Sequence, residues 1–216
     1  HRDLHLSIRR QRQMCIRDRG RIILNSYPTW QQPPVPDFMP YLEGAAQIIK
    51  DHEITLDEDG ILDLLQIKYR WPEPALEVIN QCQKKSNGFF DSRGYIYYDR
   101  WKRLYDLGFT SLLSNIMDLT SELRSLDDKL FEYKGSETNA NMYLSAGTTK
   151  HRASFDPHNH DYHVIVKPIY GTCTWVINGK SQEVDPSDVL IIPAGTMHSV
   201  VENKEPRLSL TMNLSG

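Results

Sequence analysis

Three histidines fall within six residues of the sequence, in the stretch "FDPHNHDYH" that ends at His163. The whole chain has 216 residues and only eight histidines, so this density suggests a chemical role. In an extended strand, residues two apart point the same way, and His158 and His160 can therefore bind one metal ion together. His163 falls on the opposite face, where we expect it to be a bystander or to donate a hydrogen bond from outside the ligand set.

A metal site that performs chemistry usually takes three protein ligands and keeps further positions open. The segment "PAGTMH" supplies the third ligand, because Pro193 and Gly195 make a tight turn just before His198. A histidine on a surface loop is the plainer explanation for any single one of these residues. Two histidines in alternation, followed by a third after a glycine turn, favour a metal site instead. Four other histidines lie in segments that we do not expect at this site: His1, His5, His52 and His151.

The sequence from Asn141 onward is typical of short strands. Six segments are β-branched or alternating and are separated by Gly, Pro, Asn and Asp: "NMYLSA", "YHVIVKPI", "TCTWVIN", "VLII", "HSVVEN" and "RLSLTMNL". The step "INGK" contains Asn178 and Gly179, a dipeptide that predicts a two-residue hairpin. Short strands with regular turn signals predict a β-sandwich or a β-barrel.

The segment from residue 37 to residue 138 is mostly helical in pattern. Apolar residues recur at helical spacing in "YLEGAAQIIKDH", in "PALEVINQCQ" and from Leu112 through Leu126. Between them, "SNGFFDSRGYIYYDRW" is rich in turn residues and aromatics, and the pattern leaves open whether it forms a hairpin or a loop. "TLDEDGILDLLQ" resembles a calcium-binding loop, but Thr55 and Gln66 stand where acidic ligands belong. We therefore expect an acidic turn in solvent rather than a calcium site.

The composition describes one globular domain with an N-terminal layer. A chain of this length with 39% hydrophobic residues can bury one core, and no apolar run approaches the length of a membrane span. The three cysteines are odd in number and widely spaced, which indicates neither a disulfide framework nor a metal knuckle. We expect a reducing, cytoplasmic compartment.

The first 21 residues are basic, with seven Arg against two Asp, although the chain as a whole has a net charge of −3. We interpret residues 1–20 as a non-native or disordered arm, because "RQRQMCIRDR" resembles the translated read-through of a sequencing adapter. An arm that binds nucleic acid is the disfavoured alternative. Residues 21–36 are interpreted as a Pro-rich linker, residues 37–138 as the helical layer and residues 139–216 as the metal-binding core.

Residues 139–216 resemble the cupin, or double-stranded β-helix, superfamily. "PHNHDYHVIVKPIYGTCTW" is similar to the strand pair that opens the metal site in JmjC-type oxygenases. "PSDVLIIPAGTMHSVVEN" is similar to the second cupin motif, with Ser187 where a Gly is usual. The resemblance implies a mostly β protein, a double-stranded β-helix or cupin jelly roll with an α-helical N-terminal layer. It also implies that His158, His160 and His198 hold Fe(II).

The chain departs from these oxygenases in two ways. His160 stands where the family has Asp or Glu, and three neutral imidazoles leave the metal ion with its full double positive charge. The basic residue that many JmjC enzymes carry just after the glycine, here Gly171, is absent. Arg207 and Ser209 instead resemble the RxS motif that binds the distal carboxylate of 2-oxoglutarate in other oxygenases of the superfamily. An ordinary arginine at a strand edge is the alternative for Arg207.

The function that this resemblance implies is an Fe(II)-dependent oxygenase that uses 2-oxoglutarate to hydroxylate a substrate. Two alternatives stay open: a three-His cupin dioxygenase or isomerase that does not use 2-oxoglutarate, and a non-catalytic cupin that binds a metal or a ligand. The substrate is not identified and is expected to be a protein side chain or a small molecule. We expect no membrane and no nucleic-acid partner, and a homodimer stays open. The residues expected to line the pocket are Asn141, Tyr143, Trp175 and His163.

Overall fold

The structure is a computed structural model, and it describes residues 21–24, 38–66, 76–80, 83–85, 88–147, 155–203 and 205–214. The arm of residues 1–20 and most of the expected linker lie outside the described residues. Three of the eight histidines lie outside them as well: His1, His5 and His151.

Four helices are described, each with identifiable start or stop signals: α2 (Met39–Asp51), α3 (Glu58–Gln66), α4 (Tyr98–Asp106) and α5 (Ser121–Lys134). Helix α5 begins where the side chain of Thr120 accepts a hydrogen bond from the Leu123 N–H, and it ends at Gly135 in the left-handed region. Before α3, the Asp57 carboxylate accepts a hydrogen bond from the Gly60 N–H at 2.8 Å. The acidic turn that resembles a calcium loop therefore has a structural role, as the cap of a helix.

The strands form two sheets, one of eight strands and one of three. The large sheet has the spatial order β1 (Ile22–Leu24), β9 (Val189–Ile192), β6 (His163–Tyr170), β11 (Arg207–Leu214), β5 (Asn139–Ser145), β4 (Thr110–Ser114), β2 (Leu76–Asn80) and β3 (Gln83–Lys85). The small sheet has the order β10 (His198–Asn203), β7 (Cys173–Ile177) and β8 (Lys180–Val184). Neighbouring strands are antiparallel, except that β1 and β9 are parallel.

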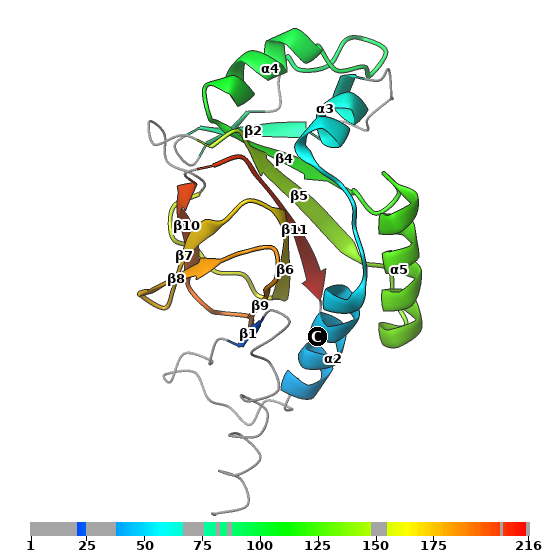
Figure 1. The fold of residues 1–216 in the computed structure, drawn as a ribbon, viewed down its shortest axis with the longest axis vertical. Coiled ribbons are helices and arrows are strands. Elements are labelled where there is room, and N and C mark those ends of the chain that lie inside the picture. The colour runs from blue at the N-terminus through cyan, green and yellow to red at the C-terminus, as the bar shows by residue number, and fades with distance from the viewer. Residues whose placement is uncertain are drawn as a thin grey trace, which may run out of the picture.

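The large sheet lies between the small sheet on one face and the helices on the other (Figure 1). Two apolar cores result. One packs the helices against the outer face of the large sheet and includes Leu208, Leu210 and Met212 of β11. The other lies between the sheets and includes Val164, Trp175 and further apolar residues of β6, β7, β9 and β10. Because side chains alternate along a strand, β6 and β9 contribute to both cores.

The expected helical layer of residues 37–138 also contains three strands, which is a correction to the sequence analysis. The part "LEVIN" of the segment "PALEVINQCQ" forms β2 rather than a helix, because Leu76 and Val78 alternate onto one buried face and pair with β4. The apolar stripe that begins at Leu112 is helical only in its second half. Leu112 lies in β4, and Asn115 has a positive φ of 58° that turns the chain before α5 begins.

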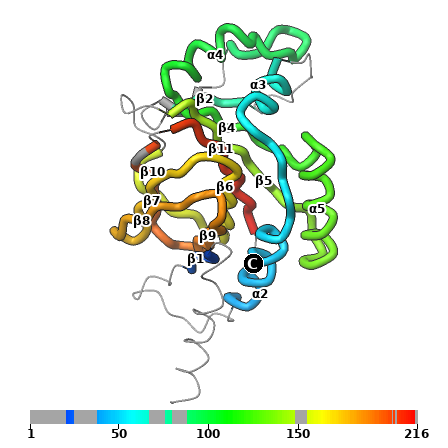
Figure 2. Tube along the Cα trace, in the orientation of Figure 1, coloured from blue at the N-terminus to red at the C-terminus, as the bar shows by residue number. Residues whose placement is uncertain are grey.

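The expected linker of residues 21–36 begins with a strand, which corrects a second boundary. Strand β1 pairs in parallel with β9 at the edge of the large sheet, as the dark blue segment of Figure 2 shows. The guanidinium of Arg21 binds the buried Asp188 carboxylate through Nε at 3.1 Å and Nη2 at 3.0 Å. This bidentate ion pair fixes the start of β1 beside the loop that leads into β9.

Three local details complete the scaffold. Asn178 and Gly179 have φ angles of 48° and 78°, so the hairpin predicted between β7 and β8 is confirmed. Strand β10 contains a β-bulge between Val200 and Glu202, where Val201 has no partner on β7. The segment that was left open as a hairpin or a loop is a turn closed by a bridge between Phe90 and Ile96.

Candidate metal centre

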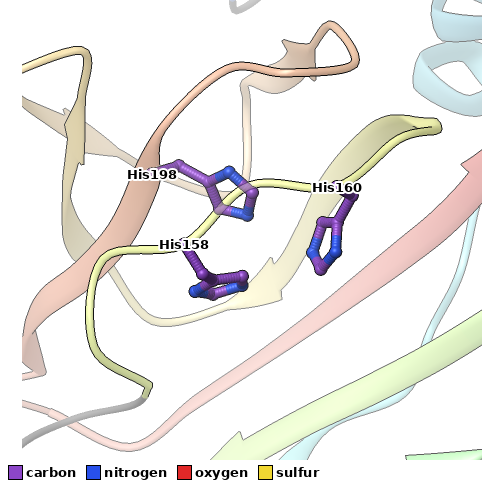
Figure 3. A group of neighbouring side chains, drawn as sticks. All are labelled: His158, His160 and His198. Carbon is purple, nitrogen blue, oxygen red and sulfur yellow. The ribbon is translucent and has the colours of Figure 1, made fainter.

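Three histidine side chains converge at one end of the space between the sheets (Figure 3). One ring nitrogen from each of His158, His160 and His198 lies within 4.8 Å of the others. The ring centroids of His158 and His198 are 4.5 Å apart, and that of His160 is 4.9 Å and 5.2 Å from them. The structure therefore brings together the three residues that the sequence indicated as metal ligands.

The backbone that carries His158 and His160 is not the strand expected from their spacing. Residues 155–162 are irregular, and β6 begins only at His163. Instead, His158 and His198 exchange two backbone hydrogen bonds, of 3.0 Å and 2.8 Å, in an isolated bridge. The Gly195 N–H donates to the carbonyl oxygen of His160 at 2.7 Å. Pairing between two loops and one strand, rather than alternation along one strand, places the rings together.

Two of the rings are oriented by backbone carbonyl groups. Nδ1 of His158 lies 2.8 Å from the carbonyl oxygen of Asp156, and Nδ1 of His198 lies 2.9 Å from that of Thr196. A carbonyl oxygen can only accept, so both Nδ1 atoms carry the proton and both Nε2 atoms keep a free lone pair. This is the tautomer that a histidine needs to bind a metal through Nε2.

His198 is also in the protonation state that a metal requires. Burial lowers the pKa of His198 to about 4, and the nearby His158 and His160 act in the same direction against the hydrogen bond to Thr196. The His198 imidazole is consequently neutral near pH 7, and no proton has to leave it when a cation binds.

The three histidines line a cavity of about 50 Å³ between the two sheets. A buried water occupies roughly 10–15 Å³ by this kind of measure, so the cavity holds a small ligand. Of the residues expected in the pocket, Tyr143 and Trp175 line it, whereas Asn141 and His163 do not. Arg207 and Ser209 line it as well, on the face of β11 that was predicted.

Arg207 is the most unusual group in this cavity. Its side chain is only 1% exposed. Nη1 donates to the sulfur of Cys173 at 3.7 Å, while Nε and Nη2 have no hydrogen-bond partner among the described residues. Nε and Nη2 form the edge of a guanidinium that binds a carboxylate through two parallel hydrogen bonds. An unpaired buried cation is costly, and an anion bound at this edge would offset that cost.

Tyr143 supplies a neutral hydroxyl near this arginine. Burial raises the pKa of Tyr143 to about 12, and the positive charge of Arg207 only partly opposes that shift. Tyr143 and Ser209 are direct cross-strand partners of β5 and β11, so their side chains project from the same face of the sheet. The cavity lining thus offers one cation, Arg207, and two hydroxyl groups, those of Tyr143 and Ser209.

His163 lies apart from the metal cluster, on the side of the large sheet that faces α2. Its ring contacts that of Phe38 at 5.6 Å, and its Nδ1 accepts a hydrogen bond from the Ala194 N–H at 3.1 Å. Burial lowers the pKa of His163 as well. As expected, His163 lies on the face opposite to the metal cluster. It neither lines the pocket nor donates to the site through Nδ1.

Sequence reasoning missed Thr211 and Cys173, and it also missed four apolar residues that line the cavity: Phe155, Val164, Ile192 and Val200. Thr211 lines the cavity beyond Ser209, and its signal was present in "RLSLTMNL", where polar residues alternate with apolar ones in a buried strand. Cys173 was considered only as an unpaired cysteine. Its sulfur accepts hydrogen bonds from Arg207 and from the Trp175 indole at 3.1 Å, a role that depends on tertiary contacts alone.

Comparisons with known proteins agree with this architecture. The family model of the AraC-like ligand binding domain matches residues 143–213. Among curated proteins, no sequence matches the chain. Three structures of YcfD, a ribosomal oxygenase from Escherichia coli, each match 77% of the chain with TM-scores of 0.50, 0.53 and 0.55. Their sequence identities are 14%, 16% and 14%, and the second is in complex with cobalt and 2-oxoglutarate.

The chain has a cupin fold. The expected class, a mostly β jelly roll with an α-helical layer, is confirmed. The match covers 45–47% of the oxygenase chains, so this cupin chain spans just under half of their length. Within the described part of the chain, no helix is long and apolar enough to cross a membrane.

Proposed function

We propose that this cupin is an Fe(II)-dependent oxygenase that uses 2-oxoglutarate. The observation that carries the proposal is the unpaired edge of the buried Arg207, which lines the same cavity as the three-histidine cluster. A metal site and a carboxylate site in one small cavity suit a short dicarboxylate. The similarity to an oxygenase that has been seen with cobalt and 2-oxoglutarate supports the same ligand.

The histidine cluster fits a transition-metal ion. Imidazole nitrogens bind such ions at about 2.0–2.1 Å, so two neighbouring ligands of one ion are roughly 3–3.4 Å apart. The three ring nitrogens lie within 4.8 Å of one another, so a small rotation of the side chains brings them to one ion. Imidazole ligands suit iron, and Fe(II), when bound, supplies the activation of oxygen.

The residues of the chain hold and orient the co-substrate. Nε and Nη2 of Arg207 would bind its distal carboxylate, and the Ser209 and Tyr143 hydroxyl groups would donate further hydrogen bonds to it. Trp175 and the apolar side chains beside it exclude water from the middle of the cavity. A dry cavity strengthens each of these charge-assisted contacts.

The charges of the cavity favour a ligand with two negative charges. No Asp or Glu is among the described residues that line the cavity. Three neutral histidines leave the charge of a divalent ion uncompensated, and Arg207 adds a further positive charge to the same cavity. A dianion such as 2-oxoglutarate places one carboxylate at each positive centre, which a neutral ligand cannot do.

Two observations favour the other functions considered. His160 occupies the position where 2-oxoglutarate oxygenases resembling this chain have a carboxylate, which favours a three-His enzyme that works without 2-oxoglutarate. The match to an AraC-like ligand binding domain favours a cupin that binds a ligand without chemistry. The substrate of an oxygenase would be a small molecule or a protein side chain that reaches the metal end of the cavity.

The test combines metal loading, calorimetry and product analysis. Protein loaded with Fe(II) without oxygen should bind 2-oxoglutarate and, once oxygen is admitted, release succinate. Arg207→Met should weaken binding by about ten- to hundredfold at unchanged iron content, and Arg207→Lys should restore only part of it. Arg93→Met, in an exposed turn, is the matched control and should bind as wild type does. His198→Ala should lose the iron.

Each alternative has its own outcome in this experiment. Iron-loaded protein that neither binds 2-oxoglutarate nor releases succinate contradicts the proposal and leaves the three-His enzyme. Binding that depends on Arg207 without any succinate release, with or without candidate substrates, indicates a ligand-binding cupin.

A further inference from the structure

One short turn touches two histidines of the sequence cluster, His160 and His163, as well as His198. The turn comprises residues 193–196 and is closed by a hydrogen bond from the Thr196 N–H to the Pro193 carbonyl oxygen at 3.1 Å. Gly195 has a φ of 77°, which few side chains permit, so the glycine sets the shape of the turn. It connects β9 of the large sheet to β10 of the small sheet.

Consecutive residues of this turn bind three different histidines. The Ala194 N–H donates to Nδ1 of His163 at 3.1 Å, and the Gly195 N–H donates to the carbonyl oxygen of His160 at 2.7 Å. The Thr196 carbonyl oxygen accepts from Nδ1 of His198 at 2.9 Å. His158 joins through its backbone bridge to His198. A shift of the turn therefore moves the ligand set as a unit.

His163 anchors this turn from the opposite side of the sheet. It is the first residue of β6, its side chain is 6% exposed, and its ring contacts Phe38 at the start of α2. The ring is thus fixed by a strand and a helix that both lie outside the metal cluster. Its Nδ1 lone pair accepts the hydrogen bond from the Ala194 N–H. Without this acceptor, the Ala194 N–H would be an unsatisfied backbone donor in a partly buried turn.

We propose that His163 is a positioning residue, which holds the turn of residues 193–196 so that His160 and His198 face one metal ion. The inference rests on the proposed metal centre, but it concerns a residue that does not touch the metal. It gives the third histidine of "FDPHNHDYH" a function through its backbone contact rather than through coordination.

The experiment compares two substitutions of His163 that differ in one acceptor. His163→Asn keeps an oxygen near the place of Nδ1, whereas His163→Leu keeps apolar volume and removes the acceptor. Each folded variant is titrated with Co(II) alone, with the visible absorption of the bound ion as the readout. His163→Leu should bind Co(II) about ten- to hundredfold more weakly and with an altered spectrum, as is usual when the support of a metal ligand is lost. His163→Asn should retain most of the wild-type affinity and spectrum.

A matched control separates positioning from general stability. His52 also uses a ring nitrogen in a tertiary hydrogen bond, from Nε2 to the Glu122 carbonyl oxygen at 2.8 Å, but it joins α2 to α5 away from the cluster. His52→Leu should lower the melting temperature and leave the Co(II) spectrum unchanged. If folded His163→Leu shows the wild-type affinity and spectrum, His163 does not position the site.

A second measurement tests the inference without any metal. In metal-free protein labelled with ¹⁵N, a coupling across the hydrogen bond should join the Ala194 amide nitrogen to Nδ1 of His163, and His198 should carry its proton on Nδ1. In His163→Leu the His198 tautomer should become mixed. Absence of the coupling in the wild type overturns the inference, whereas failure of the wild type to bind Co(II) with the coupling present contradicts the proposed function alone.

Discussion

The two faces of the large sheet contain different chemistry. On the helix side, β11 presents only apolar residues: Leu208, Leu210, Met212 and Leu214. On the cavity side, the same strand presents Arg207, Ser209 and Thr211, which are buried and polar. Apolar burial stabilises the fold, whereas buried polar groups without partners destabilise it. The comparison indicates that one strand serves stability on one face and ligand binding on the other.

Substitutions of adjacent residues of β11 test most directly whether the two faces differ in role. Leu210→Ala removes apolar volume from the helix side and should lower the free energy of unfolding by about 2–5 kcal/mol. Ser209→Ala changes the cavity side and should cost less than about 1.5 kcal/mol while weakening the binding of 2-oxoglutarate. Urea unfolding and calorimetry measure the two effects. Equal losses of stability at both positions would show that the faces do not differ in role.

The next largest change in the free energy of unfolding should be a gain rather than a loss. Arg207→Met replaces a buried, incompletely paired guanidinium by an apolar side chain of similar length, and it should raise the free energy of unfolding by about 1–3 kcal/mol in ligand-free protein. The gain reflects the cost of keeping a cation buried for an absent ligand. A less stable Arg207→Met would mean that contacts within the chain, such as that with Cys173, already compensate the charge.

A smaller loss is expected at the edge of the sheet. Arg21→Ala removes a bidentate contact to the buried Asp188 but leaves that carboxylate a hydrogen bond from the backbone N–H of residue 21. Because Arg21 itself is largely exposed, the cost should be about 1 kcal/mol.

Removal of residues 1–20 should change neither the melting temperature nor the metal content. A large loss on that deletion would show that the basic arm is part of the fold.

The smallest effect is a dependence of stability on pH. Burial lowers the pKa of His163 in the folded protein, whereas in the unfolded chain it returns to about 6.5. Below about pH 6.5 the unfolded chain therefore binds more protons, and the free energy of unfolding falls as the pH decreases toward the folded pKa. Thermal melts of metal-free protein across this range should show a shallower slope in His163→Asn. If the melting temperature of His163→Asn depends on pH as strongly as that of the wild type, the pKa of His163 is not lowered in the folded protein.

The sequence predicted the core of the fold because its strands follow a simple alternation. The hairpin at Asn178 and the ends of the later strands depend on local signals that physical chemistry fixes within a few residues. The segment before residue 139 was harder, since apolar spacing in "PALEVIN" satisfies a helix and a strand alike. Only the pairing of β2 with β4 distinguishes them, and that contact is not local.

The candidate site was predicted in its members but not in its geometry. His158, His160 and His198 were recognisable by type and spacing, although the strand assumed for the first two does not exist. The pocket role expected for His163 failed, because its partner is the backbone of Ala194 rather than a side chain. Every residue except proline has a backbone N–H, so the sequence does not indicate which of them binds a side chain. Contacts of this kind are seen only in the tertiary structure.

The bulge in β10 has a consequence for how this strand can change in length. Val200 pairs with Trp175 and Asn203 pairs with Cys173, so both face inward, while Val201 stands outside the ladder with half of its side chain exposed. Loss of Val201 in a related gene would straighten the strand yet leave its neighbours facing as before. A one-residue gain or loss elsewhere in β10 would invert every side chain beyond it. We therefore expect natural variation in the length of this strand to concentrate at Val201.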